Sequence, residues 1–183
     1  MSRLRRFQLF AAVAVSFVLG ACATPARVEQ MQIDTPMAAR VAIASSALKE
    51  SIAIKDVSGG GETNPLWMSK VASADFERAL EASLRSAGLA ALGRQAGRFQ
   101  LTAHLQKLDQ PFAGFSMTVT ATVEYTLIER ATGRDVFKQT IAASHTASVS
   151  DAFVGVERLK LANEGAARGN IQKLIEALSQ LRV

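Results

Sequence analysis

The residue best placed to do chemistry is Cys22, the only cysteine among the 183 residues. With one thiol, no disulfide can form within the chain. A thiolate is a strong nucleophile, and an unpaired cysteine in an exported protein usually has a reason to be kept. The residues just before it, Gly20 and Ala21, are small, and a long apolar run precedes them.

That apolar run belongs to a segment with the composition of a secretory signal peptide. Three arginines (Arg3, Arg5 and Arg6) come first without any acidic residue, and residues 9–19 are then almost wholly apolar. A membrane-spanning helix needs about 20 apolar residues, and this run is shorter and lacks a basic patch after it. We therefore expect residues 1–21 to direct export and to be removed.

The end of the segment, Leu19-Gly20-Ala21-Cys22, resembles the lipobox of bacterial lipoproteins. The resemblance implies cleavage between Ala21 and Cys22, a diacylglyceryl thioether on Cys22 and acylation of its new amino group. Each buried CH₂ contributes about 0.8 kcal/mol, so two or three acyl chains hold a protein on a bilayer almost permanently. The alternatives are an ordinary cleaved signal with an incidental cysteine, and an uncleaved membrane anchor.

The residue after the cysteine bears on which membrane carries the protein. In the lipoprotein family, an Asp at that position tends to retain the protein on the inner membrane. Here the position holds Ala23. The resemblance thus implies the periplasmic leaflet of the outer membrane, with the periplasmic face of the inner membrane as the alternative.

The net charge of +5 does not indicate a nucleic-acid partner. Without the three arginines of residues 1–21, the 21 basic residues become 18, against 16 acidic ones. No Lys/Arg run with interleaved aromatics follows. We expect no binding to nucleic acid.

The other candidates for chemistry are His104, His145 and Asp151. Both histidines fall in predicted strands and no second cysteine accompanies them, so we expect no metal and no cofactor. Ser144 and Ser148 lie near Asp151 in sequence, but neither sits in a GxSxG motif. No pair of carboxylates stands in an apolar context that would tune one for acid–base work. We therefore expect a protein that is not an enzyme.

The elements that follow alternate between two periodicities. Residues 22–37 have no sustained period and predict the lipidated cysteine and a flexible tether, and residues 38–183 predict a single domain. Period-two alternation predicts strands over residues 51–57, 99–106, 115–127 and 136–149. Apolar residues at 3.6-residue spacing predict helices ending near Gly88 and over residues 156–181. Residues 38–48 fit a strand or a helix.

These elements give the order β-α-β-β-β-α. An antiparallel sheet of about four strands, with both helices packed on one face, would bury every apolar stripe, and this is an α+β fold. Gly59-Gly60-Gly61 lacks the Lys-Ser/Thr of a phosphate-binding loop and predicts a turn. Gly165 and Gly169 would let the last helix approach a strand closely.

The whole chain after Cys22 resembles the small YajG-like lipoproteins and, more distantly, the LptE-like lipoproteins of lipopolysaccharide assembly. The shared pattern is the lipobox, Phe76-x-x-Ala79-Leu80-x-x-x-Leu84-x-x-x-Gly88-Leu89, strands from Phe99 and a helix through Asn170-Ile171. The resemblance implies a periplasmic role in binding or assembling another envelope component. A groove carrying a small apolar ligand or lipid, with Trp67, Phe115 and Met117 in its walls, is the alternative.

Overall fold

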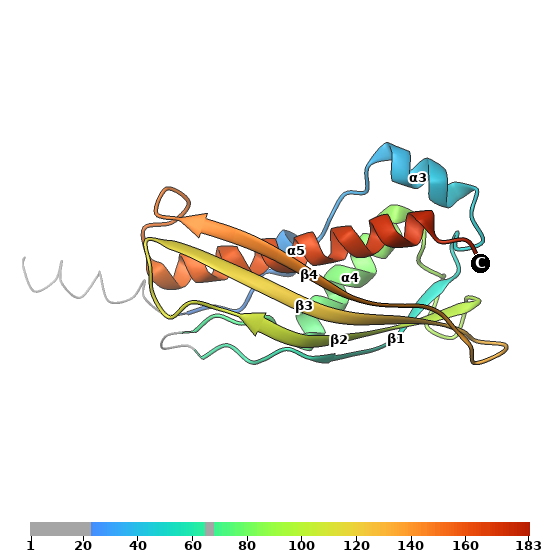
Figure 1. Ribbon diagram of the computed structural model, residues 1–183, viewed down its shortest axis with the longest axis horizontal. Helices are drawn as coiled ribbons and strands as arrows, with labels where there is room; N and C mark the ends of the chain where they lie inside the picture. Colours follow the sequence, from blue (N-terminus) through green and yellow to red (C-terminus); the bar gives the residue numbers. More distant parts are fainter. Residues whose placement is uncertain (1–22, 65–67) are drawn as a thin grey trace, which may run out of the picture.

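The computed structural model describes residues 23–64 and 68–183 (Figure 1). Two short helices come first, α2 (Val28–Met31) and α3 (Met37–Ala44). The remaining elements are β1 (Ile52–Gly59), α4 (Ser73–Ala87), β2 (Phe99–Asp109), β3 (Ser116–Glu129), β4 (Asp135–Ser148) and α5 (Gly155–Gln180). From β1 onward, this is the β-α-β-β-β-α order and the α+β class that the sequence predicts.

The sheet differs from the prediction in the direction of one strand. Its four strands stand in the order β1-β2-β3-β4, with β2–β3 and β3–β4 antiparallel. The prediction of a wholly antiparallel sheet is wrong for β1, which pairs with β2 in parallel. The cause lies in the connection, because α4 carries the chain back across the sheet between β1 and β2, and such a crossover joins parallel strands.

Helices cover one face of the sheet, and the other face is open. In β3 every second residue from Met117 to Glu129 is buried, and the residues between them are partly or fully exposed. Helix α5 lies along β3 and β4, whereas α4 packs against β1 and also touches α5 (Figure 1). The placement of both long helices on one face is confirmed.

Gly88 and Gly165 have the roles that the sequence predicts for them, the first at a helix end and the second at a close contact. Gly88 ends α4 in the left-handed region, at φ 76°, and its N–H bonds back to the last turn. Gly165 of α5 lies so close to His145 of β4 that a Cβ at this position would overlap the imidazole ring. Gly165 thus allows the close approach of helix and strand that the sequence predicts.

The flexible tether predicted for residues 22–37 is wrong over the part that the structure describes. Five residues there are buried, namely Ala23, Ala26, Met31, Ile33 and Thr35. Helix α2 contacts both α4 and α5, and the Ile33 N–H donates to the Ser83 hydroxyl of α4 at 3.1 Å. Ala26, Met31 and Ile33 belong to the main core, although their spacing is too irregular to show a period in the sequence.

Candidate functional site

Glu164 of helix α5 holds the chain just after the predicted cleavage site. Its carboxylate accepts hydrogen bonds from the Arg27 backbone N–H at 2.8 Å, and from Nε and Nη2 of the Arg27 guanidinium, each at 2.9 Å. The Glu164 side chain is 3% exposed and that of Arg27 is 45% exposed. The hydrogen bond to Glu164 raises the pKa of Arg27. This contact therefore pins the N-terminal segment to α5 with a charged, two-pronged pair.

Thr24 is held by two further side chains at the same place. Lys160 Nζ donates to Thr24 Oγ1 at 3.0 Å and also pairs with Glu157 at 2.9 Å. The Ser69 hydroxyl donates to the Thr24 carbonyl at 2.8 Å. Residues 24–27 thus lie along the first turns of α5. The described chain therefore begins at this end of α5.

A buried polar cluster connects this end to the loop after β2. Gln110 Nε2 donates to the Ser69 carbonyl at 2.9 Å and to Asn163 Oδ1 at 2.6 Å. Asn163 Nδ2 donates to the same Ser69 carbonyl at 2.8 Å. Asn163 and Ser69 are fully buried, so the loop after β2, the loop before α4 and helix α5 are fixed to one another.

Arg158 ties together the two loops that end the molecule on this side. It reaches the loop between β2 and β3 through Gly114, whose carbonyl accepts from Nη2 at 2.9 Å. It reaches the loop between β4 and α5 through the carbonyls of Ala152, at 2.9 Å, and Phe153, at 2.6 Å, which accept from Nη1. Arg158 is buried, so its hydrogen bonds are shielded from water.

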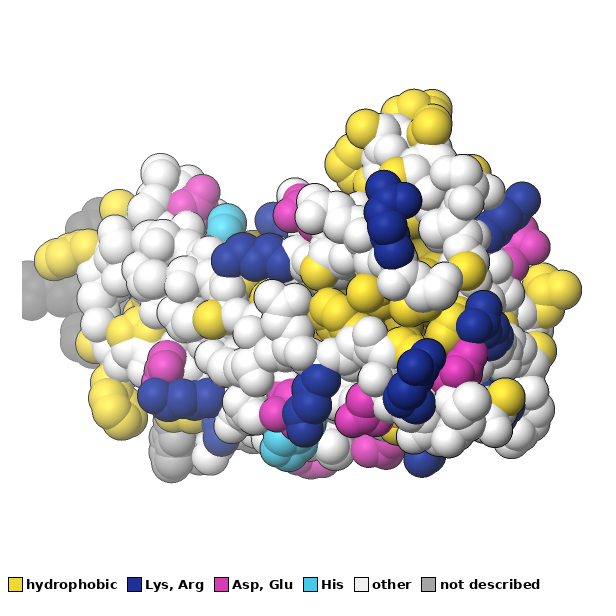
Figure 2. Space-filling view, turned by 45° about the vertical axis from the view of Figure 1, so that its right-hand side comes forward, with side chains coloured by type: hydrophobic (Ala, Val, Ile, Leu, Met, Phe, Trp, Pro, Cys, Tyr) yellow, Lys and Arg dark blue, Asp and Glu magenta, His cyan; other side chains and the backbone are white. Residues whose placement is uncertain are grey.

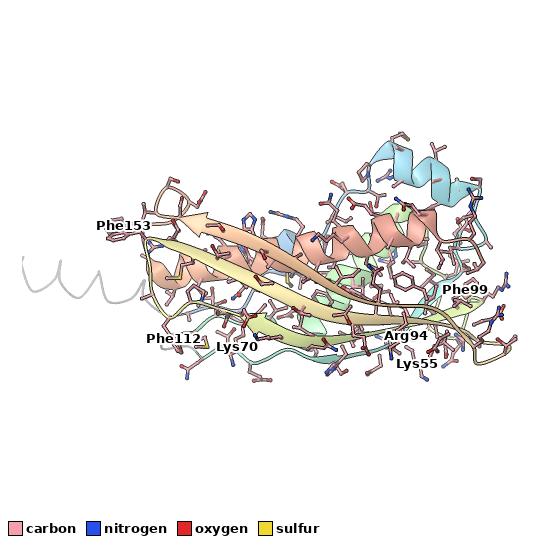
Figure 3. All side chains as sticks on the ribbon, viewed as in Figure 1. Lys55, Lys70, Arg94, Phe99, Phe112 and Phe153 are labelled. Atoms are coloured by element: carbon pink, nitrogen blue, oxygen red, sulfur yellow. The ribbon has the colours of Figure 1, made fainter. Side chains whose placement is uncertain are left out.

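Three phenylalanines project from these loops into solvent. Phe112 is 96% exposed, Phe153 is 92% exposed and Phe115 is 85% exposed. Figure 3 places Phe112 and Phe153 at one end of the molecule, and Figure 2 shows hydrophobic side chains projecting there. We call these three residues the phenylalanine tip. Phe112 and Phe153 lie in loops and carry no periodicity, and Phe115, which the alternation predicts as the start of a strand, lies just before β3. The available sequence signal was the absence of charge in residues 110–117.

The sequence-predicted site residues are distributed as follows. The lipobox (Leu19, Gly20, Ala21, Cys22) and Trp67 lie outside the described residues. Met117 is buried and lines a hollow of about 340 Å³ together with Phe112, Leu159 and Arg158. Phe115 is exposed and does not line this hollow. Met117 therefore shares this hollow with Phe112, and Phe115 has no part in it.

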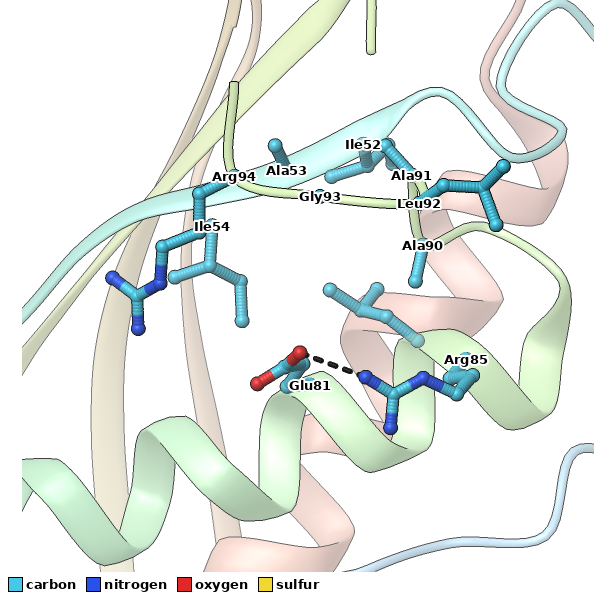
Figure 4. Close-up of a pocket in the computed structure, with 11 residues that line it drawn as sticks. Ile52, Ala53, Ile54, Glu81, Arg85, Ala90, Ala91, Leu92, Gly93 and Arg94 are labelled. Atoms are coloured by element: carbon cyan, nitrogen blue, oxygen red, sulfur yellow. Dashed lines mark hydrogen bonds and ion pairs between the residues drawn. The ribbon is translucent and has the colours of Figure 1, made fainter. Parts of the chain in front are cut away.

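A second hollow lies where β1, α4 and the loop after α4 meet (Figure 4). Its volume is about 210 Å³, and Ile52, Ile54 and Leu84 give it apolar walls. The ion pair between Arg85 and Glu81, at 2.8 Å, lies on one side. Leu92, also in its wall, is fully exposed. We call it the β1 hollow. Arg94, one of the residues that line it, lies far from Phe112 and Phe153 in Figure 3.

His104 and His145 lie on opposite faces of the sheet, and His145 shares a small hollow with Asp151. His104 lies on the open sheet face, where Nδ1 is 3.0 Å from the Ser58 hydroxyl. His145 faces α5 and lines a small hollow with Asp151. The Asp151 carboxylate accepts from the Ser148 N–H and hydroxyl, both at 2.8 Å, and these bonds lower the pKa of Asp151. Within the described ranges, no group of three or more His, Cys, Asp or Glu residues could hold a metal ion.

Over residues 23–64 and 68–183, no helix is both long enough and apolar enough to cross a bilayer.

No family model matches the sequence, and no curated protein is similar to it. Solved structures do match. A Xanthomonas campestris protein of the DUF330 family is 16% identical, with 72% of this chain and 75% of that chain covered and a TM-score of 0.50. A Caulobacter crescentus protein assigned as a lipoprotein is 14% identical, with 76% and 95% covered and a TM-score of 0.49. PelC from Paraburkholderia phytofirmans, solved as a dodecamer, is 19% identical, with 73% and 89% covered and a TM-score of 0.49.

At such identities the likeness concerns the fold alone. The chain is similar in fold to the Xanthomonas protein, and no specific function follows from that likeness.

Proposed function

We propose that this protein is a lipoprotein acylated at Cys22, which faces the periplasm and binds or assembles another component of the cell envelope without catalysing a reaction. The observation that carries the proposal joins sequence and structure. The lipobox of residues 19–22 is followed at once by a segment fixed to α5 through Thr24 and Arg27. An acyl anchor would therefore hold the domain in a defined orientation on the bilayer.

The polar groups of the described chain support binding over catalysis. Glu164, Glu129 and Asp151, which lie in well-ordered polar contacts, are each engaged by a structural partner, namely Arg27, Arg98 and Ser148. His145 and Asp151 do share a hollow, of about 120 Å³, but the Asp151 carboxylate there accepts from the Ser148 N–H and hydroxyl, whereas a catalytic carboxyl would keep its reactive atom free for substrate. Replacement of His104, His145 and Asp151 together should leave the cellular role intact; loss of function in a folded triple variant would argue for an enzyme.

For the envelope partner, the β1 hollow is the surface we favour. It lies at the end of the molecule away from the phenylalanine tip, so an anchored protein would present it toward the periplasm (Figure 3). The hollow combines an exposed apolar side chain, Leu92, with apolar walls from Ile52, Ile54 and Leu84, so it can bury an apolar side chain of a partner. The resemblance to YajG-like and LptE-like lipoproteins also favours a role in binding or assembly.

The experiment places a photoreactive amino acid in place of Leu92 in the acylated protein within its own host. The matched control carries the same group in place of Thr118, which is exposed on the open sheet face. We expect one stoichiometric crosslinked species from position 92 and none from position 118. Equal crosslinking from both positions, or none from either under mild conditions, would count against a partner at this surface.

A carrier of an apolar ligand remains the second candidate, because Met117 and Phe112 line a hollow of about 340 Å³. Native mass spectrometry of protein purified from its host separates the two functions. A co-purifying ligand that is lost in a Met117→Glu variant would favour the carrier, whereas a ligand-free protein favours the binding role.

The proposed location is the periplasmic leaflet of the outer membrane, with the inner membrane's periplasmic face as the alternative. Separation of the two membranes by density should place the protein in the outer fraction. An Ala23→Asp variant should move to the inner fraction, and a wild-type protein already found there would contradict the outer-membrane assignment.

A further inference from the structure

The phenylalanine tip is an unusual surface for a protein in water. Phe112, Phe115 and Phe153 stand on two neighbouring loops, each of them more than four-fifths exposed. Single exposed apolar residues are common, but several large ones at one end mark an interaction surface. Core packing does not explain them, since the buried cluster of this region includes Met117, Leu159 and Ala162 but none of the three phenylalanines.

The two loops are suited to a dehydrated setting. Residues 110–117 and 152–156 contain no charged side chain, and the one charge of the second loop, Asp151, is bonded to Ser148 at its base, so burying the phenylalanines strips water from few ions. The carbonyls of Gly114, Ala152 and Phe153 already accept hydrogen bonds from Arg158 inside the protein. Backbone groups that are satisfied internally lose little when they leave water.

The tip also lies at the end where the anchor would leave the protein. Thr24 is bonded to Lys160 and Ser69, and Ser69 is bonded through its carbonyl to Gln110, two residues before Phe112. Lys160 stands little more than one helical turn after Gly155, the first residue of α5. The start of the described chain and both loops of the tip therefore share one end of the molecule.

We propose that Phe112, Phe115 and Phe153 insert into the interfacial region of the bilayer that carries the acyl chains. This inference rests on the proposed acylation of Cys22 and adds a second, non-covalent contact to it. Aromatic side chains that project from a protein surface partition into the boundary between headgroups and acyl chains. With the anchor and the tip both engaged, the long axis of α5 points away from the membrane and the β1 hollow faces the periplasm.

The experiment uses the acylated protein in vesicles of phosphatidylethanolamine and phosphatidylglycerol, some of whose acyl chains carry bromine, which quenches indole fluorescence at close range. Trp67→Phe provides a background without the native indole. Phe112→Trp and Phe153→Trp report on the tip, and Leu92→Trp, at an equally exposed apolar position, is the matched control. Circular dichroism verifies the fold of each variant, and intact mass verifies its acylation.

We expect strong quenching of the indole in the Phe112→Trp and Phe153→Trp variants and none in the Leu92→Trp variant. Adding Phe112→Ser and Phe115→Ser to the Phe153→Trp variant should reduce its quenching, because the tip then loses most of its apolar surface. Equal quenching at all positions, or none at the tip of a correctly acylated protein, would overturn the inference and leave the proposed function standing. If the tip instead contacts a protein, the indoles at positions 112 and 153 would not be quenched. Absence of acyl chains would overturn both proposals.

Discussion

At the scale of single residues, a buried hydrogen-bonded pair couples α5 to the sheet. The Tyr125 hydroxyl of β3 donates to Asn170 Oδ1 at 2.8 Å. Asn170 Nδ2 in turn donates to the carbonyls of Ala121, at 3.0 Å, and Ile141, at 2.8 Å, on two different strands. Burial raises the pKa of Tyr125 well above its ordinary value, so the hydroxyl stays protonated and remains a donor.

The first prediction concerns this pair. Asn170→Ala should lower the free energy of unfolding by about 2–3 kcal/mol, because it leaves the buried Tyr125 hydroxyl without its acceptor. Tyr125→Phe removes only the donor and should cost about 1 kcal/mol. Urea unfolding of both variants checks this order. A smaller loss for Asn170→Ala than for Tyr125→Phe would show that the pair does not couple helix and sheet.

Glu129, at the end of β3, makes stability depend on pH. Arg98 donates to Glu129 Oε1 from Nη2 at 2.7 Å and from Nε at 3.0 Å, and Thr132 donates to Oε2 at 2.8 Å. These bonds lower the pKa of Glu129 below 4.5. A carboxyl with a lowered folded-state pKa stabilises the fold above its unfolded pKa and loses that contribution as pH falls through the folded value.

The second prediction follows from the lowered pKa of Glu129. Wild-type protein should be more stable than Glu129→Gln above pH 4.5, and the difference should shrink as the pH falls below that value. Thermal unfolding of both proteins across this range measures it. Arg98→Gln should show the same convergence. A difference that grows in acid would mean that Glu129 is not held by these donors.

At the scale of elements, the contact between α5 and β4 depends on the absence of one side chain. Gly165 leaves room for the His145 ring, and a Cβ there would overlap it. Gly169, one turn further along, faces the Ala143 Cβ, and a Cβ added at Gly169 would lie at an ordinary 3.5 Å from it. Two glycines of the same helix thus differ in what they permit.

The third prediction uses this difference. Alanine is a better helix former than glycine by about 1 kcal/mol, so Gly169→Ala should be neutral or stabilising. Gly165→Ala should instead destabilise by about 1–3 kcal/mol, because the helix must shift away from His145. The double variant Gly165→Ala/His145→Ala should recover most of that loss in chemical denaturation. No recovery in the double variant would place the strain elsewhere.

The fourth prediction concerns the pairing of the N-terminal segment with α5. Arg27→Ala removes the guanidinium and leaves the buried Glu164 carboxylate only the backbone N–H of residue 27, which should cost about 2 kcal/mol. It should also speed hydrogen exchange over residues 23–36, while the sheet stays protected. The control is Arg78→Ala, which removes an exposed pair with Asp75 and should change stability by less than about 0.5 kcal/mol. Unchanged exchange over residues 23–36 would show that this pair does not hold the segment.

Periodicity explains which elements could be predicted from the sequence. Strand β3 alternates over its whole length, and α4 and α5 carry apolar stripes, so their class and order follow from local pattern. The parallel pairing of β1 and the burial of Met31 and Ile33 depend on contacts between distant segments. Local pattern does not encode such contacts, and for this reason the sheet direction and the tether were predicted wrongly.

The residues of the candidate site likewise fall into two groups, those of a linear motif and those that the fold brings together. The assignment of Cys22 stays a prediction, and it rests on a short linear motif that can be seen in the sequence alone. The buried contacts of Glu164 with Arg27 and of Arg158 with the two loops join residues far apart in the chain, or in different loops. Only the fold reveals that residues 24–27 and the phenylalanine tip share one end of the molecule.

At the scale of the whole molecule, the proposals define an orientation. One end would carry the acyl chains and the phenylalanine tip, and the other end, with the β1 hollow and Leu92, would face the periplasm (Figure 3). A domain pinned to its anchor through Arg27 and Thr24 cannot reach far from the bilayer. A partner at the β1 hollow would therefore have to come within one domain length of the membrane.

The most direct test of this account is the intact mass of the mature protein, with fragmentation of its N-terminal peptide. The account predicts a chain that begins at Cys22, carries a diacylglyceryl thioether on its sulfur and is acylated on its amino group. A mature chain that begins at another residue, or a Cys22 with a free thiol, would contradict it.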